Sequence, residues 1–204
     1  MNRLGFLIAR TLRNETALQS LSVPQSDLLA ALKDKHVALV GNARALAQTG
    51  HGKRIDNADL VIRINRAPMP AAASHGTRTD WLALATRLPD ADRDRIAPAR
   101  ILWMSPKRKR LDWQTAISPG FYLHPLGDYQ ALRDQLGAPP TTGAMMIALI
   151  TWSQMARLEL FGFDFFASLS LSGRRTAEQV PHDFSQESAW VQELISSDRR
   201  IIRH

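Results

Sequence analysis

The sequence has no cysteine and no apolar run long enough to cross a membrane. The lack of cysteine among its 204 residues excludes disulfides, a cysteine nucleophile and a zinc–thiolate centre, and fits a reducing compartment. The apolar stretch Leu4–Ala9 lies between Arg3 and Arg10 and is far shorter than the ~20 residues of a membrane helix. No secretory cleavage site follows it. We therefore expect no anchor or secretory signal.

Acidic residues are fewer than basic ones, 19 against 26, which gives a net charge of +7. The excess reflects either solvated surfaces and composition, or attraction to an anionic partner such as a nucleotide sugar or a charged glycolipid surface. The densest basic run, Lys107–Arg110, has too few interleaved aromatic residues for a nucleic-acid groove. It predicts an exposed loop, with contact to an anionic acceptor as the alternative. We expect no nucleic-acid partner.

Short apolar runs alternate with helical segments along most of the chain. Such runs are typical of strands buried on both faces, and the alternation predicts an α/β fold. We expect a single Rossmann-like three-layer domain with a mostly parallel sheet over residues 36–204, and an N-terminal helical segment, 1–35, packed on it. A helix over 4–18 and a second one capped by Ser26 or Asp27 are expected there. The expected strands are 36–40, 59–65, 81–85, 101–105 and 158–163.

Two asparagines follow two of these strands. Asn42 comes after Gly41 at the end of the first strand, and Asn65 ends the second. Glycine permits a sharp turn and close approach of a phosphate, and the following helix directs its positive N-terminus to the same place. An uncharged amide suits a pyrimidine edge, a ribose hydroxyl or a phosphate ester. Since nucleotides bind at the carboxyl edge of open α/β sheets, the pair predicts a nucleotide site.

Three blocks in order resemble one family. VALVGN…RINRAP, from Val37 to Pro68, is similar to the large sialylmotif of glycosyltransferase family 29, the eukaryotic-type sialyltransferases. The segment 140–163 resembles the small sialylmotif, and HDFSQE, from His182 to Glu187, resembles the very small motif. The resemblance covers most of the chain from Val37 onward. It implies a variant of the GT-A fold and a glycosyltransferase.

The resemblance also implies roles for individual residues. Thr141, Thr142 and Gly143 match the family's segment that contacts cytidine monophosphate (CMP), and their turn is at the same time a helix N-cap. We place Gly41, Asn42, Asn65 and Gly162 in the same donor site. His182 matches the family's catalytic base. This role suits an imidazole, which titrates near neutrality and can deprotonate an acceptor hydroxyl. Glu187 matches a family glutamate with an orienting or structural role, or is an ordinary surface residue of a helix.

The resemblance predicts transfer of sialic acid, or a related sugar acid, from a CMP-activated donor to a glycan or glycolipid hydroxyl. Amide and hydroxyl donors fixed by the fold stabilise the leaving phosphate. A base that deprotonates the acceptor on the opposite face of the sugar leads to inversion of the anomeric configuration. We expect neither cofactor nor metal, because the family is metal-independent. The Asp-x-Asp patterns of Asp90, Asp92 and Asp94 alternate with arginines, as they do at the start of a solvated helix.

The chain departs from the family pattern in two ways. The two positions of the family's bridged cysteines are Val37 and Met155, which suits core packing in a cytoplasmic, bacterial-type enzyme without an anchor. A third family motif with a donor-binding His has no counterpart, since 167–180 contains no His. Arg174 or Arg175 is the expected substitute, in a loop, 167–179, that borders the site. A non-catalytic nucleotide-binding accessory or regulatory protein is therefore the alternative function.

Two further assignments have alternatives. Residues 4–18 form either a helix packed on the domain or an amphipathic Arg-bearing helix on a membrane surface, which would make the protein peripheral. Trp103 and Trp152 lie in apolar segments and are expected in the core. Trp113 lies in a polar stretch, where it can border an acceptor site.

Overall fold

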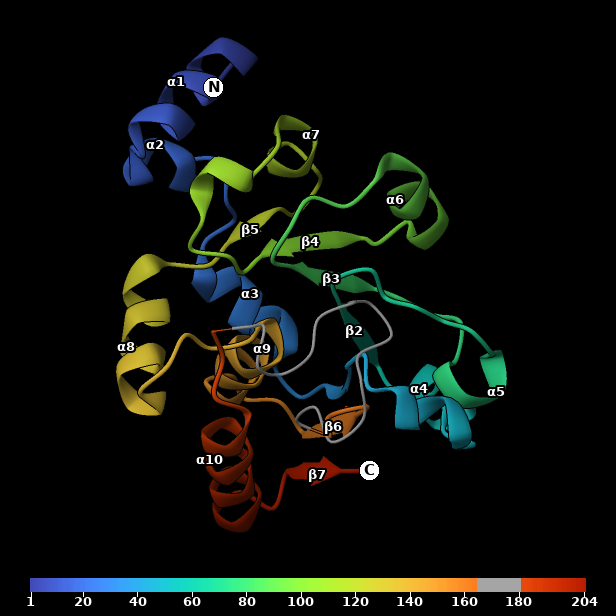
Figure 1. Cartoon of the computed structure of the whole chain (residues 1–204). Helices are drawn as coiled ribbons and strands as arrows, with labels where there is room; N and C mark the ends of the chain where they lie inside the picture. Colours follow the sequence, from blue (N-terminus) through green and yellow to red (C-terminus); the bar gives the residue numbers. More distant parts are fainter. Residues whose placement is uncertain (165–180) are drawn as a thin grey trace.

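A parallel sheet forms the centre of the protein in the computed structural model, which describes residues 1–164 and 181–204. The described residues contain seven strands in the order β5-β4-β3-β2-β1-β6-β7, and all neighbouring strands are parallel (Figure 1). The predicted α/β class is confirmed. The strands are β1 His36–Val40, β2 Leu60–Ile64, β3 Trp81–Leu84, β4 Arg100–Trp103, β5 Tyr122–Leu123, β6 Arg157–Phe161 and β7 Ile201–Arg203.

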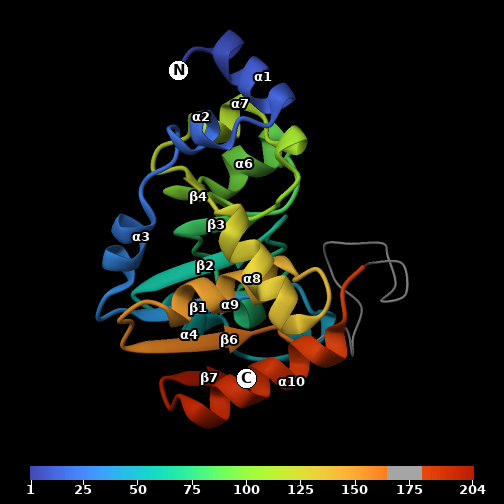
Figure 2. The same cartoon turned by 90° about the vertical axis from the view of Figure 1, so that its left-hand side faces the viewer.

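Helices cover both faces of the sheet, which makes the three predicted layers (Figure 2). One face packs against α3 Gln25–Leu32, α8 Leu126–Leu136, α9 Thr142–Thr151 and α10 Phe184–Ser197. The other packs against α1 Arg3–Leu12, α2 Glu15–Gln19, α4 Gly52–Asp56, α6 Asp90–Ile96 and α7 Trp113–Ala116, with the 3₁₀ helix η1 Arg44–Gln48. The short helices α5 Ala72–His75 and η2 Arg108–Arg110 complete the described elements.

Side chains of β1 alternate between the two faces. Val37 and Leu39 enter the core under α9, whereas Ala38 and Val40 pack toward η1 and α4. This alternation within the apolar run 37–40 is what burial on both faces requires. Val37 and Met155, the positions of the family cysteines, are both buried in the core under α9.

The strand order reverses next to β1. The chain builds β2 to β5 on one side of β1, then crosses back to place β6 on the other side. In open α/β sheets the crevice at the carboxyl ends of two such strands is where ligands bind. The ends of β1 and β6 are therefore the place to look for a site.

Three local predictions are wrong. Residues 4–18 form two helices, because Arg13 takes a left-handed conformation and the side chain of Asn14 caps α2. The helix after Pro24 begins at Gln25 without a side-chain cap, so Ser26 and Asp27 already lie inside it. Trp152, expected in the core, is half exposed after the end of α9.

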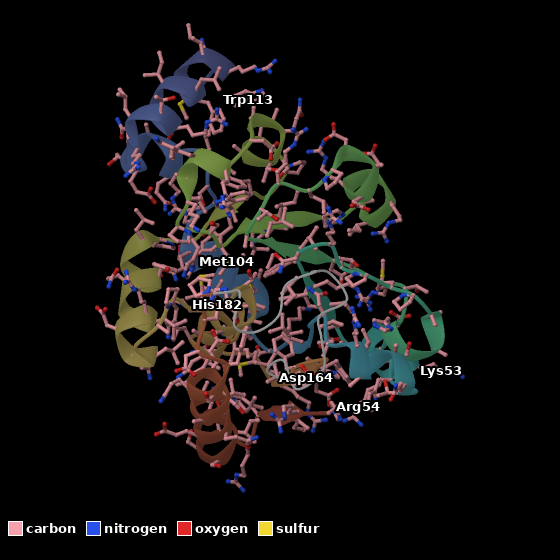
Figure 3. The ribbon with its side chains drawn as sticks, viewed as in Figure 1. Lys53, Arg54, Met104, Trp113, Asp164 and His182 are labelled. Carbon is pink, nitrogen blue, oxygen red and sulfur yellow. The ribbon has the colours of Figure 1, made fainter. Side chains whose placement is uncertain are left out.

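The other two tryptophans considered above, Trp103 and Trp113, pack on the face of the sheet that α1 and α7 cover. Trp103 is fully buried, as predicted. Trp113 packs against Phe6 of α1, with ring centroids 5.4 Å apart. In the view of Figure 3 it lies toward α1 and well away from Asp164, and its place beside an acceptor stays a prediction.

Candidate active site

Two glycines occupy the ends of β1 and β6, where the strand order reverses. The Gly41 N–H donates to the Phe161 carbonyl at 2.7 Å, and the Ala43 N–H donates to the Gly162 carbonyl at 3.2 Å. A Cβ at Gly41 would collide with the Gly162 carbonyl, and Gly162 itself has φ +69°, a conformation that favours glycine. Neither position accepts a side chain, because the two strand ends pack directly against each other.

The two predicted asparagines lie on adjacent strand ends, since β1 pairs with β2. Asn42 is buried, and its side-chain Nδ2 donates to the Ile64 carbonyl at 3.3 Å. Asn65 takes a left-handed φ of 55°, and its Oδ1 accepts the Ala85 N–H at 3.3 Å. Asparagine tolerates this backbone conformation better than most residues. Because the Asn65 oxygen is used within the fold, a contact of its side chain with a ligand would come from its Nδ2 group.

Phe163 links the β1 turn to helix α9, and sequence reasoning did not select it. A Cβ at Gly143 would lie 2.7 Å from its ring, and one at Gly41 would lie 3.2 Å from it. The half-buried ring thus packs between two glycines from distant parts of the chain. The signal in the sequence was the aromatic residue next to Gly162, but its partners are defined only by the fold.

Helix α9 begins with two backbone donors available. The Thr141 side chain caps the helix by accepting the Ala144 N–H at 3.1 Å. Within the described residues, the N–H groups of Thr142 and Gly143 have no hydrogen-bond partner. Free N–H groups and the helix dipole make this N-terminus suited to an anion. The buried Thr142 lies in the first turn, so its hydroxyl is near the same donors.

Glu187 holds Thr141 from helix α10. Its carboxylate accepts the Thr141 N–H at 2.6 Å and the Thr141 hydroxyl at 2.8 Å. The hydroxyl proton of Thr141 is therefore used within the protein, which differs from the expected direct contact with the donor. Burial raises the pKa of Glu187 to about 7, and the Thr141 hydrogen bonds lower this pKa only in part. The expected alternative of an ordinary surface residue is wrong, because Glu187 is buried.

His182 lies beside the segment that leads into α9. Its Nδ1 is 2.7 Å from the carbonyl of Pro139, two residues before Thr141. A carbonyl only accepts, so Nδ1 carries the proton and the neutral ring keeps its lone pair on Nε2. This is the tautomer that a base acting through Nε2 needs. Asp183 next to it caps α10 through the N–H groups of Ser185 and Gln186.

A continuous set of contacts joins the predicted residues. Asn42 touches the end of β2, Gly41 touches Gly162, and Phe163 connects Gly41 with Gly143. From there Thr141 connects to Glu187, and Pro139 to His182. Segments far apart in the sequence thus meet at the carboxyl edge of the sheet. The loop expected at 167–179, with Arg174 and Arg175, lies outside the described residues.

The Asp-x-Asp segment lies away from these contacts, in the first turn of α6. Asp90 pairs with Arg93 at 2.6 Å, and Asp92 pairs with Arg95 at 3.5 Å. These are exposed pairs between neighbouring turns of one helix, as the arginine alternation predicted. In the described part of the chain, no group of three His, Cys, Asp or Glu side chains is arranged for a metal ion.

Comparisons with known proteins agree with this architecture. The family model for glycosyltransferase family 29 (sialyltransferase) matches residues 3–90. A mammalian sialyltransferase, solved in complex with Gal-beta-1-3GalNAc-ortho-nitrophenol, has a similar fold with a TM-score of 0.61 at 18% identity. The match covers 84% of this chain and 69% of that one.

The sialyltransferase CstII from Campylobacter jejuni, solved in complex with the substrate analogue CMP-3FNeuAc, is a second structural match. Its TM-score is 0.56 at 13% identity, over 82% of this chain and 80% of that one. The family match and the shared fold together support a glycosyltransferase. The resemblance to family 29, the sialyltransferases, is thereby confirmed.

Proposed function

We propose that the chain transfers sialic acid or a related sugar acid from a CMP-activated donor to a glycan hydroxyl. The main support for this proposal is the set of contacts that joins Asn42, the α9 N-terminus and His182 at the carboxyl edge of the sheet. Known relatives of similar fold include a sialyltransferase solved with a CMP-sugar analogue. The donor, the inverting course and the base are parts of this proposal.

The leaving CMP is assigned to the ends of β1 and α9. Cleavage of the donor places negative charge on the phosphate, and the N–H groups of Thr142 and Gly143 are the available donors for it. The amides of Asn42 and Asn65, with the turn at Gly41 and Gly162, are assigned to the nucleoside. Phosphate charge is thus stabilised by fixed dipoles, and the proposed reaction uses no metal.

His182 is assigned as the base. With Nδ1 donating to Pro139, Nε2 removes the proton from the acceptor hydroxyl as the new glycosidic bond forms and the bond to CMP breaks. Attack opposite the leaving group inverts the anomeric configuration. Glu187 positions the α9 N-terminus through Thr141 and touches neither substrate.

We propose a cytoplasmic setting, with residues 1–35 as a helical segment attached to the catalytic domain 36–204. The acceptor is a glycan or a glycolipid. The alternative is an accessory protein that binds CMP without turnover, which the missing third-motif His favours. Turnover, rather than CMP binding, separates the two functions.

The test is transfer and hydrolysis of CMP-linked sugar acids by the purified chain. His182→Ala should lower turnover by about 10²- to 10⁴-fold, the usual contribution of a general base, while calorimetry still detects CMP binding. His36→Ala is the matched control, because that histidine lies at the opposite end of β1. Equal turnover by all three proteins removes His182 as the base. CMP binding without turnover of any donor by the unmodified chain supports the accessory function, and chelators should leave turnover unchanged.

A further inference from the structure

Helix α1 has an apolar stripe that the fold leaves exposed. Leu4, Ile8 and Leu12 follow a spacing of four residues and have exposed fractions of 66%, 52% and 73%. The opposite side of the helix packs into the domain through Phe6 and Ala9. The helix lies at the end of the molecule beyond β4 and α7 (Figures 1 and 2). One side of the amphipathic helix is thus packed on the domain, and the other side faces solvent.

Helix α1 and the neighbouring η2 segment carry several basic residues. Helix α1 contains Arg3 and Arg10 and has no Asp or Glu in its sequence. Arg10 donates to the Leu111 carbonyl at 2.9 Å, which fixes η2 beside α1. Around η2, three further cations are exposed: Lys107, Lys109 and Arg110. The predicted exposed loop is thus a basic flank of the helix.

The nearby acids do not neutralise this flank, because they are bound within the fold. Glu15 forms a two-point ion pair with Arg108, the buried member of the basic run. Asp112 caps α7 by accepting the Thr115 N–H at 3.0 Å and its hydroxyl at 2.7 Å. The exposed cations beside α1 therefore keep their charge available to a partner.

We propose that this surface, the stripe Leu4, Ile8 and Leu12 with the basic flank, docks the protein on an anionic phospholipid surface. The apolar side chains of the stripe would enter the boundary between headgroups and acyl chains, while the lysines and arginine of the flank contact the phosphates. Charge complementarity favours lipid over a second copy, since a symmetric pair would bring two basic flanks together. The described residues contain no helix able to span a bilayer, so this contact would be peripheral. The proposal is independent of the catalytic residues.

The test is flotation of the full chain with vesicles of phosphatidylcholine, alone or mixed with phosphatidylglycerol. We expect binding to the mixed vesicles that weakens as salt rises. The variant Leu4→Gln/Ile8→Gln/Leu12→Gln should lower the partition coefficient at least about tenfold. Neutralising the flank with Lys107→Gln/Lys109→Gln/Arg110→Gln should lower it about 100-fold, at a factor of about five for each charge.

Matched controls separate this surface from general apolarity and charge. Trp152→Gln removes an equally exposed apolar residue from the end of α9, and Lys33→Gln/Lys35→Gln/Lys53→Gln removes three exposed lysines elsewhere. Lys53 lies on α4, far from α1 in the view of Figure 3. Both controls should bind as the unmodified chain does.

Three results overturn the proposal: no binding to mixed vesicles, equal binding to phosphatidylcholine alone, or equal losses in the controls. If the unmodified chain self-associates without binding vesicles, and Leu4→Gln/Ile8→Gln/Leu12→Gln abolishes this association, the stripe binds a second copy instead. Circular dichroism confirms that each variant is folded. Turnover of a soluble acceptor should be unchanged in all of them, so failure of docking is distinguishable from failure of the catalytic proposal.

Discussion

The middle of strand β6 around Glu159 and the α9–α10 junction around Glu187 each bury one carboxylate, with exposed fractions of 1% and 3%. Glu159 on β6 accepts two hydrogen bonds from Arg54, at 2.7 and 2.9 Å, and His36 and His204 lie 3.3 and 3.7 Å from it. Hydrogen bonds from Arg54 lower the pKa of Glu159 to about 2, against the effect of burial.

Glu187 is equally buried but receives its hydrogen bonds from the neutral groups of Thr141, and its pKa rises to about 7. Burial dominates at Glu187, where no cation pairs with the carboxylate, whereas the hydrogen bonds from Arg54 outweigh burial at Glu159. The first carboxylate ties α4 to the sheet. The second holds the start of α9 and changes charge near neutral pH, as perturbed groups at functional sites often do.

The largest expected difference between the two regions is in turnover. Glu187→Ala removes the two carboxylate oxygens that accept hydrogen bonds from Thr141, and this releases the α9 N-terminus. We therefore expect kcat/KM to fall about 10- to 100-fold, as for a small misplacement of binding groups. Glu159→Ala should stay within about twofold of the unmodified chain. Steady-state kinetics on both variants tests this, and equal losses would contradict the assignment of the site to the α9 end.

The two carboxylates should also respond oppositely to pH. Glu187 binds its proton more tightly when folded, so its stabilising contribution is complete below its ordinary pKa of 4.5 and is lost as the pH rises through about 7. Relative to Glu187→Gln, the unmodified chain should lose about 2–3 kcal/mol of unfolding free energy between about pH 5 and about pH 8. Urea titrations at several pH values measure this. A constant difference would mean that Glu187 does not titrate there.

The Thr141 hydroxyl both caps α9 and donates a hydrogen bond to Glu187. Thr141→Val removes the acceptor for the Ala144 N–H and one donor to the carboxylate, so we expect a loss of about 1–2 kcal/mol of unfolding free energy. Thr141→Ser keeps the hydroxyl and should lie within about 0.5 kcal/mol of the unmodified chain. Denaturant midpoints compare the two, and equal losses would show that packing of the methyl group dominates.

The smallest effect is expected at Glu159. Its lowered pKa contributes stability above its ordinary value of 4.5, and this contribution is lost as the pH falls toward about 2. The Arg54 side chain is 48% exposed, so solvent screens the pair and Glu159→Gln should cost only about 1 kcal/mol at neutral pH. The cost should vanish in acid, the reverse of the Glu187 variant. A cost that persists in acid would indicate lost packing rather than lost charge.

Local patterns were enough to predict most of the sheet. The expected strand 36–40 is β1, and the runs at 59–65, 81–85, 101–105 and 158–163 each contain most of a strand. The pattern missed Tyr122–Leu123 and Ile201–Arg203 because runs of two or three residues carry no periodicity. Arg63 shows a second limit. It interrupts an apolar strand yet is buried, since the His75 and Arg78 carbonyls accept from its guanidinium.

The residue types of the site were readable in the sequence, but several of their roles were not. The motif positions Gly41, Asn42 and His182 follow from turn chemistry and from the resemblance. The hydrogen bond of the Thr141 hydroxyl to Glu187 and the packing of Phe163 could not be predicted, because each depends on a partner more than 15 residues away in the chain.

The buried strands, the glycine-rich turns at their ends and the chemical groups available there follow from residues that are neighbours along the chain. The folded arrangement was needed to establish that β6 lies beside β1, that His182 donates through Nδ1, and that Glu187 meets neutral donors whereas Glu159 meets an arginine. Strand order and burial arise from long-range packing, and the pKa of a carboxylate depends on the charges that this packing places around it.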